Sequence, residues 1–78
     1  DSAPDGREQA AQRRVADLTD RERDVAVGVG HGHSNAEIAQ QLHMSVATVK
    51  AHISHCFAKL DAANRVQVAI CMHDAGLL

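Results

Sequence analysis

The chain has 78 residues, of which 45% are apolar and a single one, Phe57, is aromatic. This length allows one small domain and excludes a second core, because domains usually run to about 100–150 residues. A core this small leaves little room for a deep substrate cavity, and no apolar run approaches the roughly 18 residues that cross a bilayer. We therefore expect a soluble binding domain that is neither an enzyme nor a membrane protein.

Charge is unevenly distributed along the chain. Ten acidic and eight basic residues give a formal net charge of −2, which by itself argues against a nucleic-acid partner. The acidic residues gather in the first half, and none lies between positions 38 and 60. Lys50, Lys59 and three histidines occupy that acid-free segment, so this part of the chain suits contact with a polyanion.

The first 17 residues have the composition of a linker or tether. Residues 7–16 favour a helix, but its apolar face is so thin that we expect it to form only when docked. Without a basic and apolar leader, we interpret the chain as a cytoplasmic fragment of a longer protein. Cys56 and Cys71 are able to pair, but outside a dense cysteine framework we expect reduced thiols.

Helix-start signals follow one another from position 19 onward. The segments Thr19-Asp-Arg-Glu22 and Ser34-Asn-Ala-Glu37 both have the form of a capping box, in which the first side chain and the last bond each other's backbone N–H groups. They predict helices over about residues 20–30 and 35–42. The glycine- and histidine-rich segment 30–33 separates the two.

The longest patterned segment begins at a third cap, Ser45, and runs through Leu60. Its apolar positions recur at helical spacing: Val49, Ile53, Cys56 or Phe57, and Leu60. Its opposite side carries small, hydroxylic or basic side chains: Ala47, Thr48, Lys50, Ala51, Ser54, His55 and Ala58. Asn64 caps a last helix over residues 65–75, and Gly76 ends it. The sequence therefore predicts an all-α fold of four helices, preceded by the weak helix of the tether.

The two helices predicted over residues 35–42 and about 46–60 have the outline of a helix-turn-helix. They are joined by a short turn, and the second is longer and contains no acidic residue. The major groove of DNA is about 12 Å wide and admits one α-helix, whose entering face needs short side chains and no carboxylates. Residues 46–58 meet both conditions. On this pattern alone, a helical bundle without a ligand remains an alternative.

Sequence motifs across residues 18–78 resemble the LuxR-type DNA-binding domain, which forms the output end of NarL/FixJ-type response regulators. The resemblance runs in register without gaps. The matching segments are Leu18-Thr-x-Arg-Glu22-Arg, Gly32-x-Ser-Asn-x-Glu37-Ile-Ala39, Leu42, Ser45-x-x-Thr48-Val-Lys50-x-His52, Lys59-Leu60, Arg65 and Ala75-Gly-Leu77. The resemblance implies a bacterial transcriptional regulator of a two-component system, with a receiver or sensor domain attached through residues 1–17.

The same resemblance implies a division of roles among the helices. The helix over about 46–60 would enter the major groove, with Lys50, Ala51 and Ser54 facing bases. Asn35, Thr48 and His52 would stand on the phosphate side. Ser54 departs from the family, in which a longer or basic residue is frequent. The last helix would pair two copies weakly, and Val66, Ala69 and Met72 are the expected dimer interface; ordinary scattered surface valines are the alternative.

Two further expectations concern single residues. His43 takes a turn position where the family commonly has glycine, so we expect a left-handed backbone there, at about 1–2 kcal/mol. Glu22 is expected to be a structural cap and an ion-pair partner of Arg65, with a solvated charge as the alternative.

The sequence favours neither zinc binding nor catalysis. His52, His55 and Cys56 share one helix and Cys71-x-His73 lies on the next, but the paired spacings of zinc sites are missing. Cys56 and His52, considered as a nucleophile and its base, have neither a pocket nor an oxyanion hole, so we expect no nucleophilic catalysis. We also expect no cofactor. The remaining alternatives are a domain like region four of sigma factors, or a protein-interaction adaptor that does not bind DNA.

Overall fold

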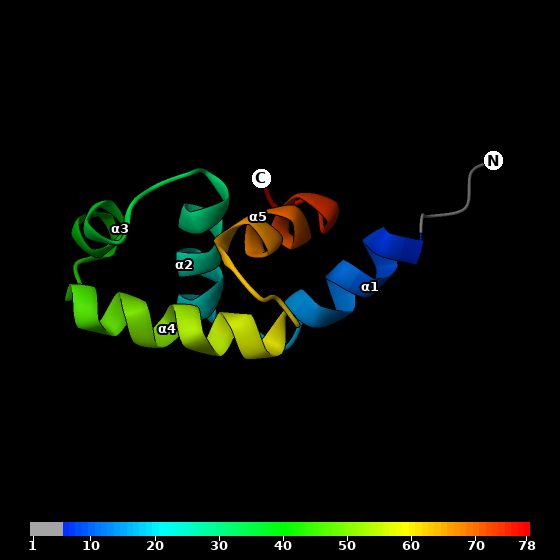
Figure 1. Ribbon diagram of the computed structural model, residues 1–78, viewed down its shortest axis with the longest axis horizontal. Helices are drawn as coiled ribbons and strands as arrows, with labels where there is room; N and C mark the ends of the chain where they lie inside the picture. The colour runs from blue at the N-terminus through cyan, green and yellow to red at the C-terminus, as the bar shows by residue number, and fades with distance from the viewer. Residues whose placement is uncertain (1–5) are drawn as a thin grey trace.

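The computed structural model describes residues 6–78, and all regular elements in this range are helices (Figure 1). They are α1 (Gly6–Val15), α2 (Asp20–Gly30), α3 (Asn35–Leu42), α4 (Val46–Lys59) and α5 (Arg65–Asp74). The all-α prediction is confirmed, and α2 to α5 correspond to the four predicted helices. The count is five because the tether segment forms a helix of its own. Residues 1–5 of the expected tether lie outside the described residues.

Each of the four predicted helices begins at the cap that the sequence indicates. Both capping boxes are complete: the backbone N–H of Thr19 donates to Glu22 Oε1 over 2.9 Å, and that of Ser34 donates to Glu37 Oε1 over 2.8 Å. Ser45 and Asn64 each accept one backbone N–H of the first turn. Such caps contribute about 0.5–2 kcal/mol each, so four short helices acquire fixed starting points.

Helix α2 lies at the centre of the domain and contacts α3, α4 and α5, while α4 lies across both α2 and α3 (Figure 1). The shared core is aliphatic, with Val25, Ile38, Val49, Leu60 and Met72 almost wholly buried. Because α4 buries one side against two helices, its other side is left on the surface of the domain.

Gly28 lets α2 and α3 approach each other closely. A Cβ at this position would lie 2.8 Å from Cγ1 of Ile38, which is too short for two carbon atoms. The absence of a side chain at Gly28 therefore allows Ile38 to fill the space directly above the α2 backbone. The glycine that weakens the helix by propensity is the one that permits this contact.

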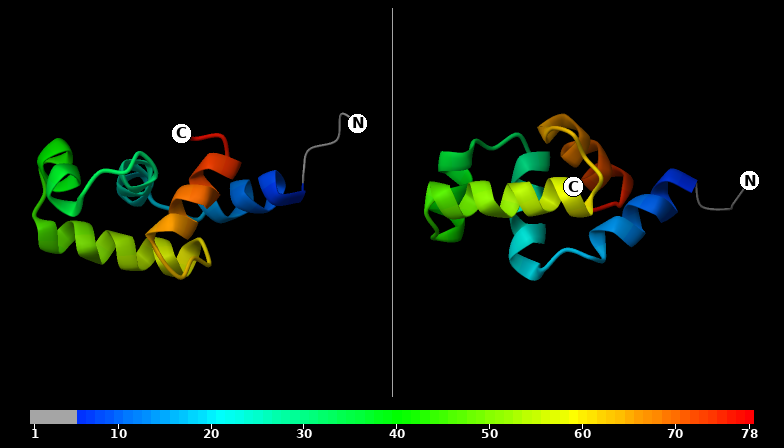
Figure 2. Two further views of the ribbon diagram at one scale, coloured as in Figure 1. Left: turned by 45° about the horizontal axis from the view of Figure 1, so that its top comes forward. Right: turned by 60° about the horizontal axis from the view of Figure 1, so that its bottom comes forward.

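The first helix is docked against α5, on the side of the domain away from α3 (Figure 2). Ala11 and Val15 are buried and belong to the same core cluster as the residues of the later helices. An ion pair of 3.9 Å between Arg7 and Asp74 joins the two helices at the surface. Two apolar residues suffice for α1 because α5 supplies the opposing surface.

None of the helices within residues 6–78 has the length and apolar content needed to cross a bilayer.

Candidate nucleic-acid interface

The turn between α3 and α4 sets the direction in which α4 leaves the domain. His43 has φ 56° and ψ 46°, so the predicted left-handed backbone is confirmed. The N–H of Met44 donates to the carbonyl of Ala39 over 3.0 Å, and that of His43 to Gln40 over 3.4 Å. These two bonds close α3 with a Schellman motif. Ser45, two residues after His43, is the N-cap of α4.

The surface of α4 that faces away from the core carries the three residues expected to face bases. Lys50, Ala51 and Ser54 are all exposed, whereas Val49 and Ile53 between them are buried. This exposed strip contains no acidic residue and only one long side chain. Its shape and charge therefore meet the steric and electrostatic requirements of a helix in the major groove.

The start of α4 offers hydrogen-bond donors to a phosphate. Its first turn has no acidic residue, so the partial positive charge of the helix N-terminus is not neutralised. The hydroxyls of Ser45 and Thr48 lie 2.9 Å apart, and Ser45 Oγ also accepts the N–H of Thr48. One hydroxyl of the pair donates to the other, which leaves the second O–H available to a phosphate oxygen.

Asn35 is held in place by Arg65 from the start of α5. Arg65 Nη1 donates to Asn35 Oδ1 over 2.6 Å, and Nη2 donates to the carbonyl of His33 over 2.8 Å. Because a guanidinium has only donors, the Asn35 amide oxygen points toward Arg65 and its NH₂ group stays free to donate. Sequence reasoning missed this positioning role, although Arg65 was among the residues that carry the family resemblance.

Glu22 anchors α4 to α2 through a nearly buried carboxylate, 4% exposed. Its Oε1 accepts Lys59 Nζ over 2.7 Å, and its Oε2 lies 3.2 Å from His55 Nδ1. The Lys59 ammonium and the N–H of Thr19 lower the pKa of Glu22 to about 2, although burial opposes this shift. The expectation that Glu22 pairs with Arg65 is wrong, because the packing of α4 on α2 brings Lys59 to Glu22 instead. The alternative, a solvated charge, is wrong as well, because the carboxylate is buried.

His52 is half-buried between the exposed strip and α2. Its Nδ1 is buried and has no hydrogen-bond partner within the described part of the chain. Only part of the ring is therefore accessible to a phosphate, and its phosphate contact stays a prediction.

The cysteines weighed for zinc or catalysis lie in the core. Cys56 and Cys71 are free thiols, and Cys56 Sγ donates to the carbonyl of Glu22 over 3.4 Å. Burial raises the pKa of Cys56 to about 11, so its thiol is protonated at neutral pH and is a poor nucleophile. The histidines of α4 lie apart from it: His55 turns to Glu22, as described above.

Helix α5 leaves an apolar surface uncovered, but not with the residues expected. Val66 is 66% exposed and Ile70, one turn later, is 54% exposed. Ala69 is half-buried beside them. Met72, expected at the dimer interface, is 0% exposed, so this expectation is wrong: α5 turns Met72 into the core that the helices share.

The model of the family described as "Bacterial regulatory proteins, luxR family" matches residues 16–72. The chain is 49% identical over 53 residues to the uncharacterized transcriptional regulatory protein YhcZ of Bacillus subtilis, and 40% identical over 53 residues to the response regulator protein VraR of Staphylococcus aureus. Each alignment covers 68% of this chain and 25% of the relative, so the chain spans about a quarter of their length.

A solved structure has the same fold. Full-length FixJ from B. japonicum superposes with a TM-score of 0.78 at 32% identity, over 92% of this chain and 37% of that chain. The high coverage of this chain shows that its helices are arranged as in part of that longer protein.

Proposed function

Because the chain belongs to the LuxR family of bacterial regulatory proteins, we propose that it is the sequence-specific DNA-binding output domain of a longer transcriptional regulator. The observation that carries this proposal is the outer surface of α4, which is exposed, free of acids and slender. The family match over residues 16–72 favours this function over a sigma-factor-like domain. The alternative, a protein-interaction adaptor that does not bind DNA, would form no complex in the test below.

In this proposal α4 lies in the major groove and reads a short half-site. Lys50 donates to O6 and N7 of a guanine, and the Ala51 methyl contacts a thymine methyl. Ser54 contributes a single hydroxyl one turn further along. The short Ser54 side chain restricts base reading mainly to the first two turns of α4.

Phosphate contacts hold the helix in register. Thr48 at the start of α4 and the free NH₂ of Asn35 at the start of α3 donate to phosphate oxygens, and the accessible edge of His52 adds a third contact. Thr48 and Asn35 belong to two helix N-termini, where backbone N–H groups also point outward. Few cations take part, so we expect the non-specific affinity for DNA to be low.

We further propose that the domain acts in the cytoplasm, joined to an N-terminal receiver or sensor domain through the residues that precede α2. The similarity to VraR, a response regulator protein, supports a two-component system. Two copies associate weakly through α5, with Val66, Ala69 and Ile70 in the interface. A twofold dimer places two recognition helices about 34 Å apart, on successive turns of the duplex.

The DNA proposal is tested with Lys50→Ala. We expect specific binding to weaken by about 1–3 kcal/mol, or about 5- to 150-fold in Kd, because one bidentate base contact is lost. The measurement is fluorescence anisotropy with an operator selected from a random DNA pool, with folding checked by circular dichroism. Arg13→Ala, which removes the same charge from the exposed side of α1, is the matched control and leaves the Kd nearly unchanged. Equal Kd values for wild type and Lys50→Ala, or no salt-sensitive complex with any selected DNA, contradict the proposal.

The dimer proposal is tested with Val66→Asp. A charge in the middle of the exposed apolar surface of α5 opposes its burial, so we expect the monomer–dimer equilibrium to shift at least tenfold toward monomer. Sedimentation equilibrium measures this shift. Gln40→Asp, which adds the same charge on exposed α3, is the control. If both variants associate like wild type, the interface lies elsewhere.

A further inference from the structure

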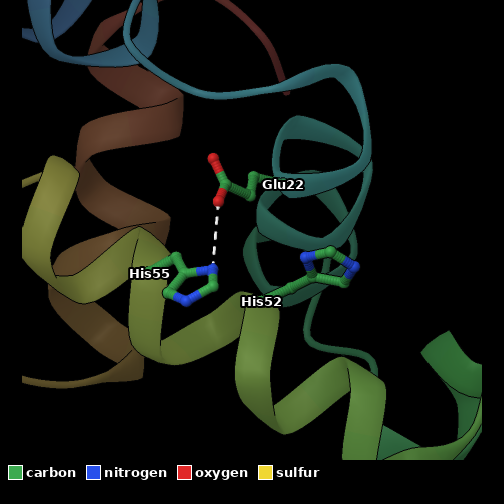
Figure 3. A group of neighbouring side chains, drawn as sticks. All are labelled: Glu22, His52 and His55. Atoms are coloured by element: carbon green, nitrogen blue, oxygen red, sulfur yellow. Dashed lines mark ion pairs between the residues drawn. The ribbon is translucent and has the colours of Figure 1, made fainter.

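We propose that Glu22, His52 and His55 form a binding site for a divalent transition-metal ion such as Zn²⁺, which bridges α2 and α4. Each of the three residues offers one ligand atom, and these atoms all lie within 4.8 Å of one another. Figure 3 shows the two rings side by side on α4, below the carboxylate that descends from α2. This site is separate from the exposed strip of Lys50, Ala51 and Ser54.

The chemistry of the three ligands suits a borderline metal ion. Two imidazoles and one carboxylate are ligands that Zn²⁺, Cu²⁺ and Ni²⁺ accept, whereas Mg²⁺ and Ca²⁺ prefer oxygen alone. His52 and His55 stand three residues apart on α4, so their side chains lie on the same side of the helix. Three protein ligands leave a fourth position for water, as in open zinc sites.

One pair of ligand atoms already has the required spacing. Around a tetrahedral ion with bonds of about 2.0 Å, neighbouring ligand atoms lie about 3.3 Å apart. Glu22 Oε2 and His55 Nδ1 are 3.2 Å apart. The ligand atom of His52 lies within 4.8 Å of the other two, and a side-chain rotation brings it closer.

Lys59 does not occupy the position that the metal needs. Its ammonium and the N–H of Thr19 both bond Oε1 of Glu22, whereas His55 faces Oε2. Glu22 therefore holds its structural contacts with one oxygen and offers the other to the metal. The nearby ammonium repels a divalent ion, so we expect weaker binding than at a structural zinc site.

His52 has an unsatisfied atom at this place. Its Nδ1 is buried and has no hydrogen-bond partner in the described range 6–78. Figure 3 shows a nitrogen of its ring turned toward the other two side chains. A buried polar atom without a partner is unfavourable by about 1–3 kcal/mol, and a bound metal ion would remove this penalty.

The test is a zinc titration of the 78-residue chain without a polyhistidine tag and without DNA. Isothermal titration calorimetry is expected to show one Zn²⁺ per chain, and His52→Asn and His55→Asn are each expected to weaken binding at least about tenfold. His31→Asn and His73→Asn remove exposed histidines elsewhere and serve as matched controls with unchanged affinity. Zinc-dependent shifts of the His52 and His55 ring signals in NMR spectra locate the ion.

Three results would overturn the proposal. The first is no zinc uptake by the folded wild type, which leaves the cluster as an ion-pair network only. The second is equal affinity in wild type, His52→Asn and His55→Asn. The third is loss of binding in His73→Asn, which assigns the ion to the Cys71 region. The His55 side chain is 61% exposed, so His55→Asn keeps the fold and the test stays decisive.

Discussion

The buried carboxylate of Glu22 makes the stability of this domain depend on pH, and Glu22→Gln isolates that dependence. Glutamine keeps the volume of the side chain and an oxygen that accepts the N–H of Thr19. It removes the charge that binds Lys59 Nζ over 2.7 Å and faces His55. The variant therefore reports on the charge that joins α2 to α4.

The magnitude follows from the pKa of Glu22, which falls from 4.5 to about 2 on folding. This lowering of the pKa corresponds to at most about 3.5 kcal/mol, since a change of one in pKa is worth about 1.4 kcal/mol. Lys59 is 35% exposed, and solvent screens its part of the interaction, so we expect about 2 kcal/mol.

The sign follows from the direction of the shift. The folded-state pKa lies below the unfolded one, so the stabilisation is complete above about pH 5.5 and is lost as the pH falls toward 2. At pH 7 we expect the free energy of unfolding of Glu22→Gln to be about 2 kcal/mol lower than that of wild type. At pH 2.5 most of this difference should vanish, because Glu22 is then largely protonated in the unfolded state and partly in the folded one.

Urea unfolding followed by circular dichroism at both pH values measures the difference. Glu37→Gln is the matched control, because Glu37 closes the same kind of capping box but is exposed and has no lysine partner among residues 6–78. At pH 7 we expect Glu37→Gln to lower the free energy of unfolding by less than Glu22→Gln does. The reasoning is refuted if Glu22→Gln is as stable as wild type at pH 7, or if its deficit is the same at pH 2.5.

Two further predictions concern the backbone. His43→Gly relieves the left-handed strain at φ 56° and should stabilise the domain by about 1 kcal/mol in the same urea assay; a loss of stability would show that the side chain compensates for the strain. Gly28→Ala places a Cβ against buried Ile38 and should destabilise the domain by about 1–3 kcal/mol. In Gly30→Ala the atoms nearest to the new Cβ belong to the half-exposed side chain of Leu78, which moves aside, so we expect a smaller loss of stability. Equal effects of the two alanines would contradict a role of Gly28 in packing.

The elements that sequence reasoning predicted correctly depend on neighbours in the chain. The capping boxes at Thr19 and Ser34 involve residues three positions apart, whereas the left-handed backbone at His43 was expected from the family resemblance. Helical spacing likewise indicated which side of α4 is buried, so the exposure of Lys50 followed from the sequence. Such signals act over about one helical turn and do not depend on the remaining fold.

The errors concern partners that lie far apart in the chain. Arg65 was expected to bind Glu22, but the start of α5, which packs on α2, brings Arg65 to Asn35 at the start of α3. The packing of α4 on α2 brings Lys59 to Glu22 instead. Met72 was expected on the surface because α5 is apolar on more than one side, and its pattern does not indicate which side faces the core.

The starts of the four capped helices, the acid-free side of α4 and the family resemblance can all be read from the amino-acid sequence. The partners of Glu22 and Asn35 and the burial of His52 Nδ1 and Met72 depend on how the helices pack in three dimensions. The physical reason is that caps and helical periodicity arise from residues within one turn, whereas an ion pair across 37 positions depends on how α2 and α4 are rotated against each other.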